Sequence, residues 1–465
     1  MIGLTRRELL RAALAAGASA AGLAACEREE RHVPVSEEWS PGEPLPWRNW
    51  SGIERCVPAR RIAPASEAEL VALLASGDFP LRPAGTGHSF SGLVPSDSAL
   101  VFLDSLAGVI SADAAALSAE VWTGTRLWRL GPALAALGQA MPNLSDIDYQ
   151  TLGGALATST HGTGARLGSL SSCVTGLWLA TPSGELLECD ARRNAEVFHA
   201  ARTSLGALGV VTRVRLANRA AFRLVERSRF VPLESLLADL ARERDANRHF
   251  ELYAFPHADT ALAIATNESE QAPDATGGDD PEAILLLRTL FRWTRALPGV
   301  GMRLYDAFLR SQPASERAGE SHEVLAHPRT VRFNEMEYTV PAELGPECLR
   351  AILAEIRARD LPVCFPLECR FVREDDVWLG MFHERAGFSI SIHQFQDEDW
   401  RPYFAAIEPI FWKFAGRPHW GKLHSLDAAR LAALYPRWSD FQAVRRSLDP
   451  RGRLMNAHLT RILGA

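Results

Sequence analysis

Hydrophobic residues in the first half of the chain occur in short runs separated by glycine-containing turns. A capping box, Ser66 followed by Glu69, precedes the run LVALLA and predicts the start of a helix. The run LGPALAALG (130–138) predicts a second short helix. Apolar segments predict strands at 81–83, 99–104 and 119–124, two strands within 173–190 around a Pro-Ser-Gly turn, and one within 204–217. Short helices mixed with short strands indicate an α+β domain that ends near residue 220.

The second half of the chain, residues 221–465, also mixes the two patterns. Residues 222–244 begin as a strand and continue as one amphipathic helix, and residues 347–360 predict another helix. Strands are expected in 332–341, in 365–375 and in 387–395, where polar and apolar residues alternate. The polar stretch 267–282 contains Gly and Pro and is expected to form a surface loop.

The first 26 residues differ from the rest of the chain. A basic start with Arg6 and Arg7 precedes an apolar stretch from Ala12 to Ala25, which is shorter than the ~20 residues of a transmembrane helix and is typical of a secretory signal. TRRELL resembles a twin-arginine export signal, and LAAC resembles a lipobox whose Cys26 becomes lipidated. Residues 27–46 have the composition of a linker. These patterns predict a lipoprotein exported by the twin-arginine pathway and anchored at the periplasmic or extracellular face of the membrane.

Composition narrows the classes of function. The chain has 465 residues, of which 47% are hydrophobic, so it can build a sizeable core. Its net charge of −6 and the lack of a basic block argue against a nucleic-acid partner. The seven cysteines form no CxxC pair, so the sequence indicates neither a zinc site nor a dense disulfide framework. We therefore predict no metal.

The segment AGTGHSF, from Ala84 to Phe90, is the first candidate for binding chemistry. Gly85 and Gly87 lack a Cβ atom, so they permit positive φ and let a ligand approach the backbone closely. Successive N–H groups in such a turn form a concave anion site that suits a pyrophosphate. The spacing is neither that of a Rossmann motif nor that of a P-loop. By itself, the motif is explained equally well by a plain tight turn.

A second segment of glycine and histidine, GGALATSTHGTG, begins at Gly153, about 70 residues further on. Together with AGTGHSF, ELLECD and SLGALGVVTRV, it resembles the flavin-binding domain of the vanillyl-alcohol oxidase superfamily. In the second half, RFNEMEYTVP, PLECR, SISIHQF, PHWGKLH and FQAVRRSLDPRGRLMN follow in the order found in the sugar-lactone and sugar-alcohol oxidases. This group contains the L-gulonolactone, D-arabinono-1,4-lactone and alditol oxidases, and the resemblance extends over residues 47–465.

The resemblance implies an α+β fold with two domains. Residues 47–220 would form a PCMH-type (vanillyl-alcohol-oxidase-like) FAD-binding domain. Residues 221–465 would form an α+β substrate (cap) domain with a mixed antiparallel sheet, whose C-terminal residues pack back on the FAD domain. The cofactor would be FAD, and the histidine of GxGHS in this family is commonly bonded to its 8α carbon.

His88 is therefore the expected covalent attachment site; the alternative is a histidine that forms hydrogen bonds within a turn. The resemblance places Ala84, Gly85, Thr86, Gly87, His88 and Ser89 around the pyrophosphate, and Gly153, Gly154, Thr158, His161, Gly162 and Val211 elsewhere along the cofactor. His161 has an alternative role in packing or backbone shape.

On the substrate side, relatives that oxidise sugar alcohols use a Glu-x-Arg pair, a histidine on a neighbouring strand and a lysine after His-Trp-Gly. The matching positions, implied as catalytic residues, are Glu368, Arg370, His393 and Lys422. Glu368 and Arg370 are two residues apart, so on a strand both side chains can reach one cavity; the alternative is a surface salt bridge on an edge strand. Phe395 stands where alditol oxidases have a threonine, which argues against straight-chain polyols as substrates.

The implied function is oxidation of a CH–OH group of a sugar lactone or sugar alcohol by hydride transfer to N5 of FAD. Arg370 and Lys422 would stabilise negative charge on the substrate oxygen and the reduced flavin. An oxidase would pass the electrons to O₂, whereas a dehydrogenase would pass them to a quinone or cytochrome at the membrane. A sugar-binding lipoprotein without turnover is the competing interpretation.

Overall fold

The computed structural model describes residues 45–273, 283–297, 300–327, 329 and 331–465, all of which belong to one compact unit, Pro44–Ala465. The twin-arginine motif, the lipobox with Cys26 and nearly all of the linker 27–46 lie outside the described residues. None of the described helices has the length and apolar character that a membrane span requires.

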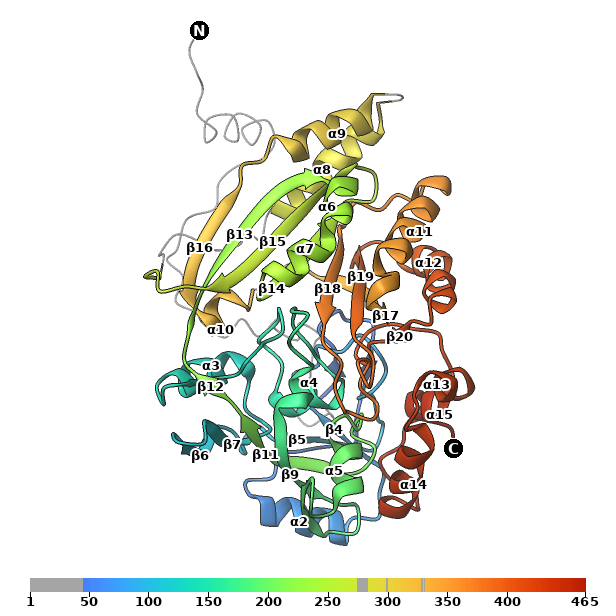
Figure 1. Cartoon of the computed structure of the whole chain (residues 1–465). Helices are drawn as coiled ribbons and strands as arrows, with labels where there is room; N and C mark the ends of the chain where they lie inside the picture. The colour runs from blue at the N-terminus through green and yellow to red at the C-terminus, as the bar shows by residue number, and fades with distance from the viewer. Residues whose placement is uncertain (1–44, 274–282, 298–299, 328, 330) are drawn as a thin grey trace, which may run out of the picture. The chain divides into compact units, whose positions relative to one another are not determined.

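The N-terminal half mixes short strands with short helices, as predicted (Figure 1). Its strands are β1 (Trp47–Arg48), β2 (Arg55–Cys56), β3 (Arg60–Ile62), β4 (Leu81–Ala84), β5 (Ala99–Phe102), β6 (Val109–Asp113), β7 (Ser118–Trp122), β8 (Gln139–Ala140), β9 (Val174–Ala180), β10 (Leu186–Asp190), β11 (Val210–Ala217) and β12 (Arg219–Ala220). Its helices are α2 (Glu67–Ser76), α3 (Leu127–Ala135), α4 (Leu152–Ala157) and α5 (Ala195–Ala201). The predicted strands and helices of this half are thus confirmed, with shifts of a few residues at their ends.

Two sheets organise this half. One is parallel with the order β3–β5–β4, and the other is antiparallel with the order β10–β9–β11–β7–β6. The predicted capping box begins α2: the Ser66 hydroxyl accepts the Glu69 N–H at 3.1 Å, and the Glu69 carboxylate accepts the Ala65 N–H at 2.8 Å. The strand β4 leads directly into AGTGHSF, so the parallel sheet fixes where that motif begins.

The C-terminal half is built on an eight-stranded antiparallel sheet with the order β16–β13–β15–β14–β18–β19–β17–β20. The strands are β13 (Arg223–Pro232), β14 (His249–Ala254), β15 (Thr260–Glu268), β16 (Ser315–Glu320), β17 (Phe333–Pro341), β18 (Leu367–Val372), β19 (Gly387–Phe395) and β20 (Arg417–Pro418). The helices are α6 (Leu233–Ala238), α7 (Leu240–Ala246), α8 (Ala283–Arg295), α9 (Gly301–Arg310), α10 (Ser321–Val324), α11 (Gly345–Ala358), α12 (Arg401–Lys413), α13 (Ala428–Leu434), α14 (Trp438–Leu448) and α15 (Ala457–Leu463).

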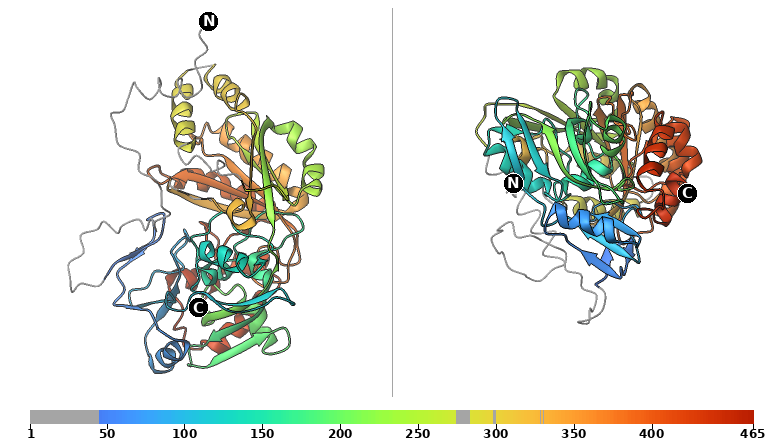
Figure 2. Two further views of the ribbon diagram at one scale, coloured as in Figure 1. Left: turned by 90° about the vertical axis from the view of Figure 1, so that its left-hand side faces the viewer. Right: turned by 90° about the horizontal axis from the view of Figure 1, so that it is seen from below.

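Helices pack on both faces of this sheet. Val231 and Ala263 belong to the main hydrophobic cluster with the leucines of α6, whereas Phe230 and Leu262 belong to a cluster with α8 and α9. Because successive strand residues point to opposite faces, α6 and the α8–α9 pair lie on opposite sides of β13 and β15. Figure 1 and the left view of Figure 2 show the eight-stranded sheet above the N-terminal half.

Two local expectations were wrong. The helix expected after β13 is broken into α6 and α7 at Asp239, which leaves the helical region with φ −94° and ψ 2°. The strand expected at 387–395 is confirmed as β19, and all nine of its residues are buried, because α11 packs against it while the other face is enclosed at the site described below. Asn267 and Glu268, expected in a loop, end β15, and residues 274–282 lie outside the described residues.

The buried Arg82 connects the C-terminal residues to the strand that precedes AGTGHSF. Its guanidinium and Nε donate to four backbone carbonyls at 2.5–2.8 Å: those of Leu93, Leu205, Gly206 and Leu454. Burial lowers the pKa of Arg82 to about 9, so it remains a cation at neutral pH. Residues close to the C-terminus thus contact β4, and one side chain fixes three loops around the start of the glycine motif.

Candidate active site

Two cavities adjoin one another in the described part of the chain. The smaller, here called the glycine cleft, has a volume of about 130 Å³ and is lined by AGTGHS, Gly153, Gly154 and Val211 among others. The larger, here called the charged cavity, has a volume of about 370 Å³ and lies on the face of the eight-stranded sheet that α8 covers. Four residues line both: His88, Ser89, Gln150 and Thr158. The two cavities are therefore neighbouring parts of one site.

Glycines let neighbouring backbone segments approach one another closely around the cleft. A Cβ atom on Gly85 would lie 2.4 Å from Oγ1 of Thr151, and Gly87 has a φ of +76° that side chains disfavour. A Cβ on Gly153 would lie 3.0 Å from the Cβ of Thr123. Bulkier residues at these positions would collide with neighbouring segments, so glycine backbone lines this part of the cleft. Such walls suit a ligand that is bound through N–H groups, such as a pyrophosphate.

Ten of the twelve expected cofactor-binding residues line this cleft: Ala84, Gly85, Thr86, Gly87, His88, Ser89, Gly153, Gly154, Thr158 and Val211. His161 and Gly162 do not. His161 lines the charged cavity, and a Cβ on Gly162 would lie 2.1 Å from the carbonyl oxygen of Leu144. Glycine is needed at position 162 because a side chain there would collide with the backbone of Leu144. The segment from Gly153 to His161 therefore extends from the glycine cleft to the charged cavity.

His88 stands where the two cavities meet. Its ring stacks on Trp50 at a centroid distance of 5.8 Å and lies 6.1 Å from the ring of Tyr149. Burial, together with the nearby charges of Lys422 and Arg126, lowers the pKa of His88 to about 4. The imidazole is therefore neutral at physiological pH, and one ring nitrogen carries a free lone pair. A neutral imidazole at a cavity boundary can act as a nucleophile or a hydrogen-bond acceptor.

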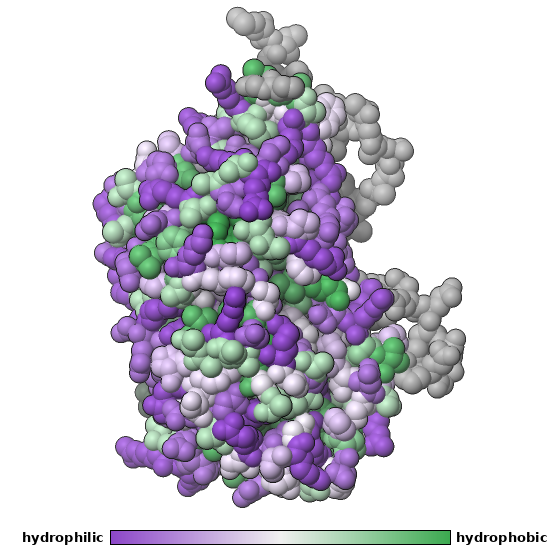
Figure 3. Space-filling model, turned by 90° about the vertical axis from the view of Figure 1, so that its right-hand side faces the viewer, coloured by the Kyte–Doolittle hydropathy of each residue, from purple (hydrophilic) through white to green (hydrophobic). Residues whose placement is uncertain are grey.

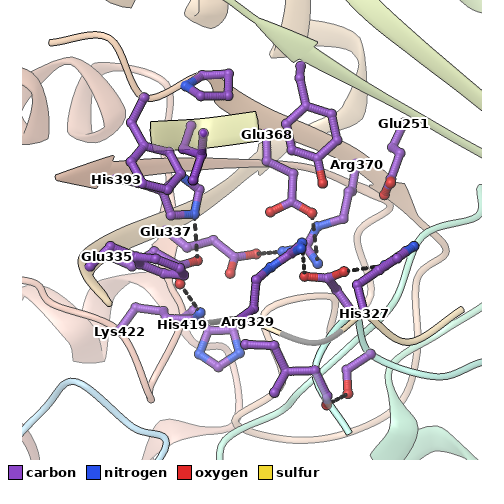
Figure 4. A pocket seen from close by; sticks show the side chains of 18 of the residues that line it. Glu251, His327, Arg329, Glu335, Glu337, Glu368, Arg370, His393, His419 and Lys422 are labelled. Atoms are coloured by element: carbon purple, nitrogen blue, oxygen red, sulfur yellow. Dashed lines mark hydrogen bonds and ion pairs between the residues drawn. The ribbon is translucent and has the colours of Figure 1, made fainter. Parts of the chain in front are cut away.

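Lys422, Glu335 and His393 lie at one end of the charged cavity (Figure 4). The Lys422 ammonium forms an ion pair with Oε2 of Glu335, and Oε1 of the same carboxylate lies 3.6 Å from Nε2 of His393. Burial raises the pKa of Glu335, but Lys422 and His393 outweigh it and bring that pKa down to about 2. Glu335 is therefore a buried carboxylate that positions both an ammonium and an imidazole.

Arg370 lies between two other carboxylates. Its Nη2 is 3.3 Å from Oε1 of Glu337, and its Nη1 is 3.5 Å from Oε1 of Glu368. Burial alone would lower the pKa of Arg370, but Glu368 and Glu337 raise it, so the guanidinium remains charged. Burial raises the pKa of Glu337, but Arg370 and His161 hold it well below its usual range. The structure thus brings Glu368, Arg370, His393 and Lys422 to one cavity, with two further glutamates among them.

His161 and His419 complete the region around Glu337. Nε2 of His161 lies 2.7 Å from Oε1 of Glu337, the oxygen that also contacts Arg370. Nδ1 of His419 accepts the N–H of Gly421 at 3.0 Å, so the proton of its neutral ring is on Nε2. Burial lowers the pKa of His419 to about 3. Among the described residues, His161, Glu337 and His419 are close enough to share an ion, but the Arg370 guanidinium already neutralises Glu337.

Glu251 lies near Arg370 and Glu368 in Figure 4, without a drawn interaction. It pairs with Arg370 across the β14–β18 ladder and lines the charged cavity. Burial, and then the charge of Glu368, raises the pKa of Glu251 to about 8. At neutral pH its carboxyl group is therefore protonated and can donate a hydrogen bond. Next to it, Asp146 is held ionised by Arg329 and by His327, whose Nδ1 is 2.7 Å away.

Comparison with known proteins agrees with this arrangement. Residues 58–190 match a FAD-binding domain family, and residues 214–462 match the D-arabinono-1,4-lactone oxidase family. The chain is 36% identical to an L-gulono-1,4-lactone dehydrogenase of Mycobacterium tuberculosis, over 90% of this chain and 99% of that one. It is 29% identical to an L-gulonolactone oxidase of Bos taurus (90% and 98% covered) and 29% identical to an alditol oxidase of a Streptomyces species (89% and 98% covered).

Solved structures with the same fold include a solvent-stable cholesterol oxidase, with a TM-score of 0.74 and 19% identity, covering 90% of this chain and 97% of that one. A cholesterol oxidase from B. sterolicum matches with a TM-score of 0.70 and 16% identity, covering 90% and 96%. At these identities the likeness shows the fold alone.

Fold and cleft together define a flavoprotein with a vanillyl-alcohol-oxidase-like FAD-binding domain and a substrate domain. The chain belongs to the D-arabinono-1,4-lactone oxidase family. It is a FAD-dependent oxidoreductase that acts on CH–OH donors. The predicted fold class, the FAD cofactor and the class of enzyme are therefore confirmed.

Proposed function

We propose that this enzyme oxidises a CH–OH group of a sugar lactone or sugar alcohol in the charged cavity, with O₂ as the electron acceptor. The observation that carries the proposal is the meeting of that cavity with the glycine cleft at His88, so that a substrate and a flavin can face each other. The cavity is lined by many hydrogen-bonding groups, as recognition of a polyhydroxylated molecule requires. The names of the mycobacterial, bovine and Streptomyces relatives support this substrate class.

The glycine cleft fits FAD because its closely approaching backbone suits the pyrophosphate. Gly85, Thr86 and Gly87 would hold the pyrophosphate, and Gly153 would lie along the rest of the cofactor. His88 would attach the flavin covalently through its neutral ring. Bound FAD would supply the hydride acceptor, its N5 atom.

The four residues expected at the substrate each have a distinct role. Lys422 and Arg370 would stabilise the negative charge that develops on the substrate oxygen as its proton leaves, and the charge that the flavin would carry after it accepts the hydride. His393, next to Glu335, would take the hydroxyl proton, so that the C–OH group becomes C=O. Glu368 would orient Arg370 and accept a hydrogen bond from a second substrate hydroxyl. Their common cavity holds these groups before the substrate arrives, which lowers the cost of orienting them.

The test is a substrate screen over sugar lactones, polyols and aldoses with simultaneous measurement of dye reduction and peroxide. We expect turnover with a lactone or cyclic polyol and peroxide formation in air. Dye reduction without peroxide would mean that the electron acceptor is a quinone or cytochrome rather than O₂. The name of the mycobacterial relative, a dehydrogenase, favours this alternative. No turnover with any of these substrates by the FAD-loaded enzyme would reject the proposed substrate class.

Export and lipidation are part of this proposal. The twin-arginine and lipobox patterns support removal of residues 1–25 and acylation of Cys26. The mass of the protein extracted from membranes is expected to be that of a lipidated chain beginning at Cys26, and a Cys26→Ser variant should not be processed. An unmodified chain that retains residues 1–25 would contradict this.

A pH-dependent prediction concerns Glu251. Because its folded-state pKa is raised to about 8, its carboxyl group is a neutral donor below that pH and an anion beside Glu368 above it. We expect the KM of the wild type to rise about tenfold for each pH unit above the folded pKa, whereas that of Glu251→Gln stays flat, since the amide is always neutral. The contribution of the protonated carboxyl to stability is likewise fully present below its unfolded pKa, near 4.5, and is lost as the pH rises through about 8.

Steady-state kinetics and thermal unfolding across this pH range check the prediction. At pH 7, Glu251→Gln should keep the wild-type KM, whereas Glu251→Leu, which cannot donate, should raise it. Equal KM profiles for the wild type and Glu251→Gln would mean that this carboxyl group does not contact the substrate.

A further inference from the structure

The segment from Leu285 to Leu304, in α8, α9 and the residues between them, holds more than half of the large hydrophobic side chains exposed in the described part of the chain. Of the eleven large hydrophobic side chains exposed there, six lie between Leu285 and Leu304. Trp293 is 75% exposed. We call these six residues the hairpin patch: Leu285, Leu286, Trp293, Leu297, Val300 and Leu304. Concentrations of this kind mark interaction sites rather than ordinary surface. The side of the molecule in Figure 3 carries hydrophobic side chains in small groups among hydrophilic ones.

The opposite sides of the same helices are already occupied. Phe291 of α8 packs with Tyr305 and Leu309 of α9 in a buried cluster that includes Phe255. Ile284 and Leu287, in the first turns of α8, line the charged cavity. The hairpin patch is therefore not a core face left open by chance: α8 already has a buried side, and Leu285, Leu286 and Trp293 are exposed away from it. A single helix separates the patch from the cavity.

The charges along this segment indicate what covers the patch. From Ala283 to Tyr305 the sequence contains four arginines and no acidic residue, in a chain whose net charge is −6. The arginines are Arg288, Arg292, Arg295 and Arg303; the first three also pair with carboxylates of neighbouring segments, Asp397, Glu398 and Asp360. Leucines and an exposed tryptophan bordered by arginines form the pattern of a helix that lies in a membrane interface, where the apolar side enters the lipid and the basic groups meet anionic headgroups.

We propose that the hairpin patch docks on the surface of an anionic lipid bilayer. Docking brings the α8 wall of the charged cavity against the lipid, which places the enzyme within reach of an electron acceptor dissolved in the membrane. This consequence rests on the proposed oxidoreductase function, whereas the docking itself does not. The patch acts independently of Cys26, because its residues lie in α8, α9 and the turn between them.

The test is vesicle flotation of the FAD-loaded enzyme expressed from Glu27, which contains the whole compact unit but neither the signal nor the acylated cysteine. The vesicles contain phosphatidylcholine and phosphatidylglycerol in equal parts. We expect the parent protein to float with them and the variant Trp293→Gln/Leu297→Gln/Leu304→Gln to bind at least about tenfold more weakly, because three exposed apolar side chains no longer enter the lipid. Vesicles of phosphatidylcholine alone should bind the parent less well.

A matched control removes exposed apolar side chains from elsewhere. Ile110 and Leu137 are 39% and 46% exposed, so Ile110→Gln/Leu137→Gln tests for non-specific stickiness and should float like the parent. Turnover with a soluble dye is expected to be equal in all three proteins; its absence in the parent would count against the proposed function and leave the flotation result intact.

Three outcomes overturn the proposal. They are a parent that stays out of the vesicle fraction, a hairpin variant that floats equally well, and a control variant that loses binding to the same extent. A further result would identify another occupant of the patch. If neither protein floats, and sedimentation shows the parent as a dimer and the hairpin variant as a monomer, then the patch is an interface with a second copy of the chain.

Discussion

Replacing Lys422 by methionine is expected to lower the rate of flavin reduction by roughly 100- to 1,000-fold while the fold and the FAD remain. Lys422 is one of two cations in the charged cavity proposed to meet the developing negative charge, and methionine keeps most of its volume without the ammonium. The chain contains only two lysines, Lys413 and Lys422, among its 50 basic residues. A lysine at this position in so arginine-rich a chain indicates that a compact ammonium, rather than a planar guanidinium, is needed next to Glu335.

The measurement is anaerobic flavin bleaching by the substrate in a stopped-flow instrument. Lys413, exposed at the end of α12, provides the matched control, and Lys413→Met should reduce its flavin at the wild-type rate. Because Lys422→Met removes the ammonium from the buried Glu335 and leaves it only His393, it is expected to cost about 3–5 kcal/mol of stability. The double variant Lys422→Met/Glu335→Gln should recover much of that stability without recovering the rate. A single variant that reduces its flavin at full rate would remove Lys422 from the reaction.

Local pattern was sufficient for much of this fold, since the strands of the N-terminal half and the capping box at Ser66 are encoded within a few residues. The glutamates of NEMEY show how far such a pattern reaches. The sequence predicted the strand but not a role for these glutamates; Glu335 and Glu337 are two residues apart on β17 and therefore share a face. The sequence could not show that this face meets Lys422 and Arg370, because those contacts depend on the order β18–β19–β17–β20, with Lys422 following β20.

No sequence motif identified Glu251 or Asp146 as a residue of the site. Glu251 is recognisable as a site residue only once β14 pairs with β18, and Asp146 lies in an irregular loop of the other half of the chain. Their unusual protonation arises from burial among charges that come from distant segments, which no local motif records. The first two turns of α8, in contrast, contain the apolar spacing Ile284, Leu287 and Phe291 that could have predicted the helix. What the spacing cannot reveal is that Leu285 and Leu286, between Ile284 and Leu287, remain exposed.

Replacing His88 by alanine is expected to abolish the covalent bond between protein and flavin while leaving the glycine cleft able to bind FAD. The wild type should give a fluorescent band on a denaturing gel under ultraviolet light, and His88→Ala should give none, because no other described histidine lines both cavities. The variant should still copurify with FAD, which acid precipitation would then release. His199 on α5 lies outside both cavities, so His199→Ala should keep the band.

The lowered pKa of His88 makes this prediction sharper. With a pKa of about 4, the imidazole is neutral throughout the physiological range, so its ring nitrogen would need no prior loss of a proton to bond to the 8α carbon. In that bond formation the 8α methyl group would lose a proton, and the flavin would take up the electron pair of the broken C–H bond and pass it to the O₂ acceptor. Attachment of FAD to the apoprotein should therefore proceed at nearly the same rate between about pH 5 and 8, where an ordinary histidine titrates. A rate that falls steeply below pH 6.5 would show a histidine with an ordinary pKa. A band that persists in His88→Ala would place the bond on another residue, and a wild type without a band would leave FAD held by the cleft alone.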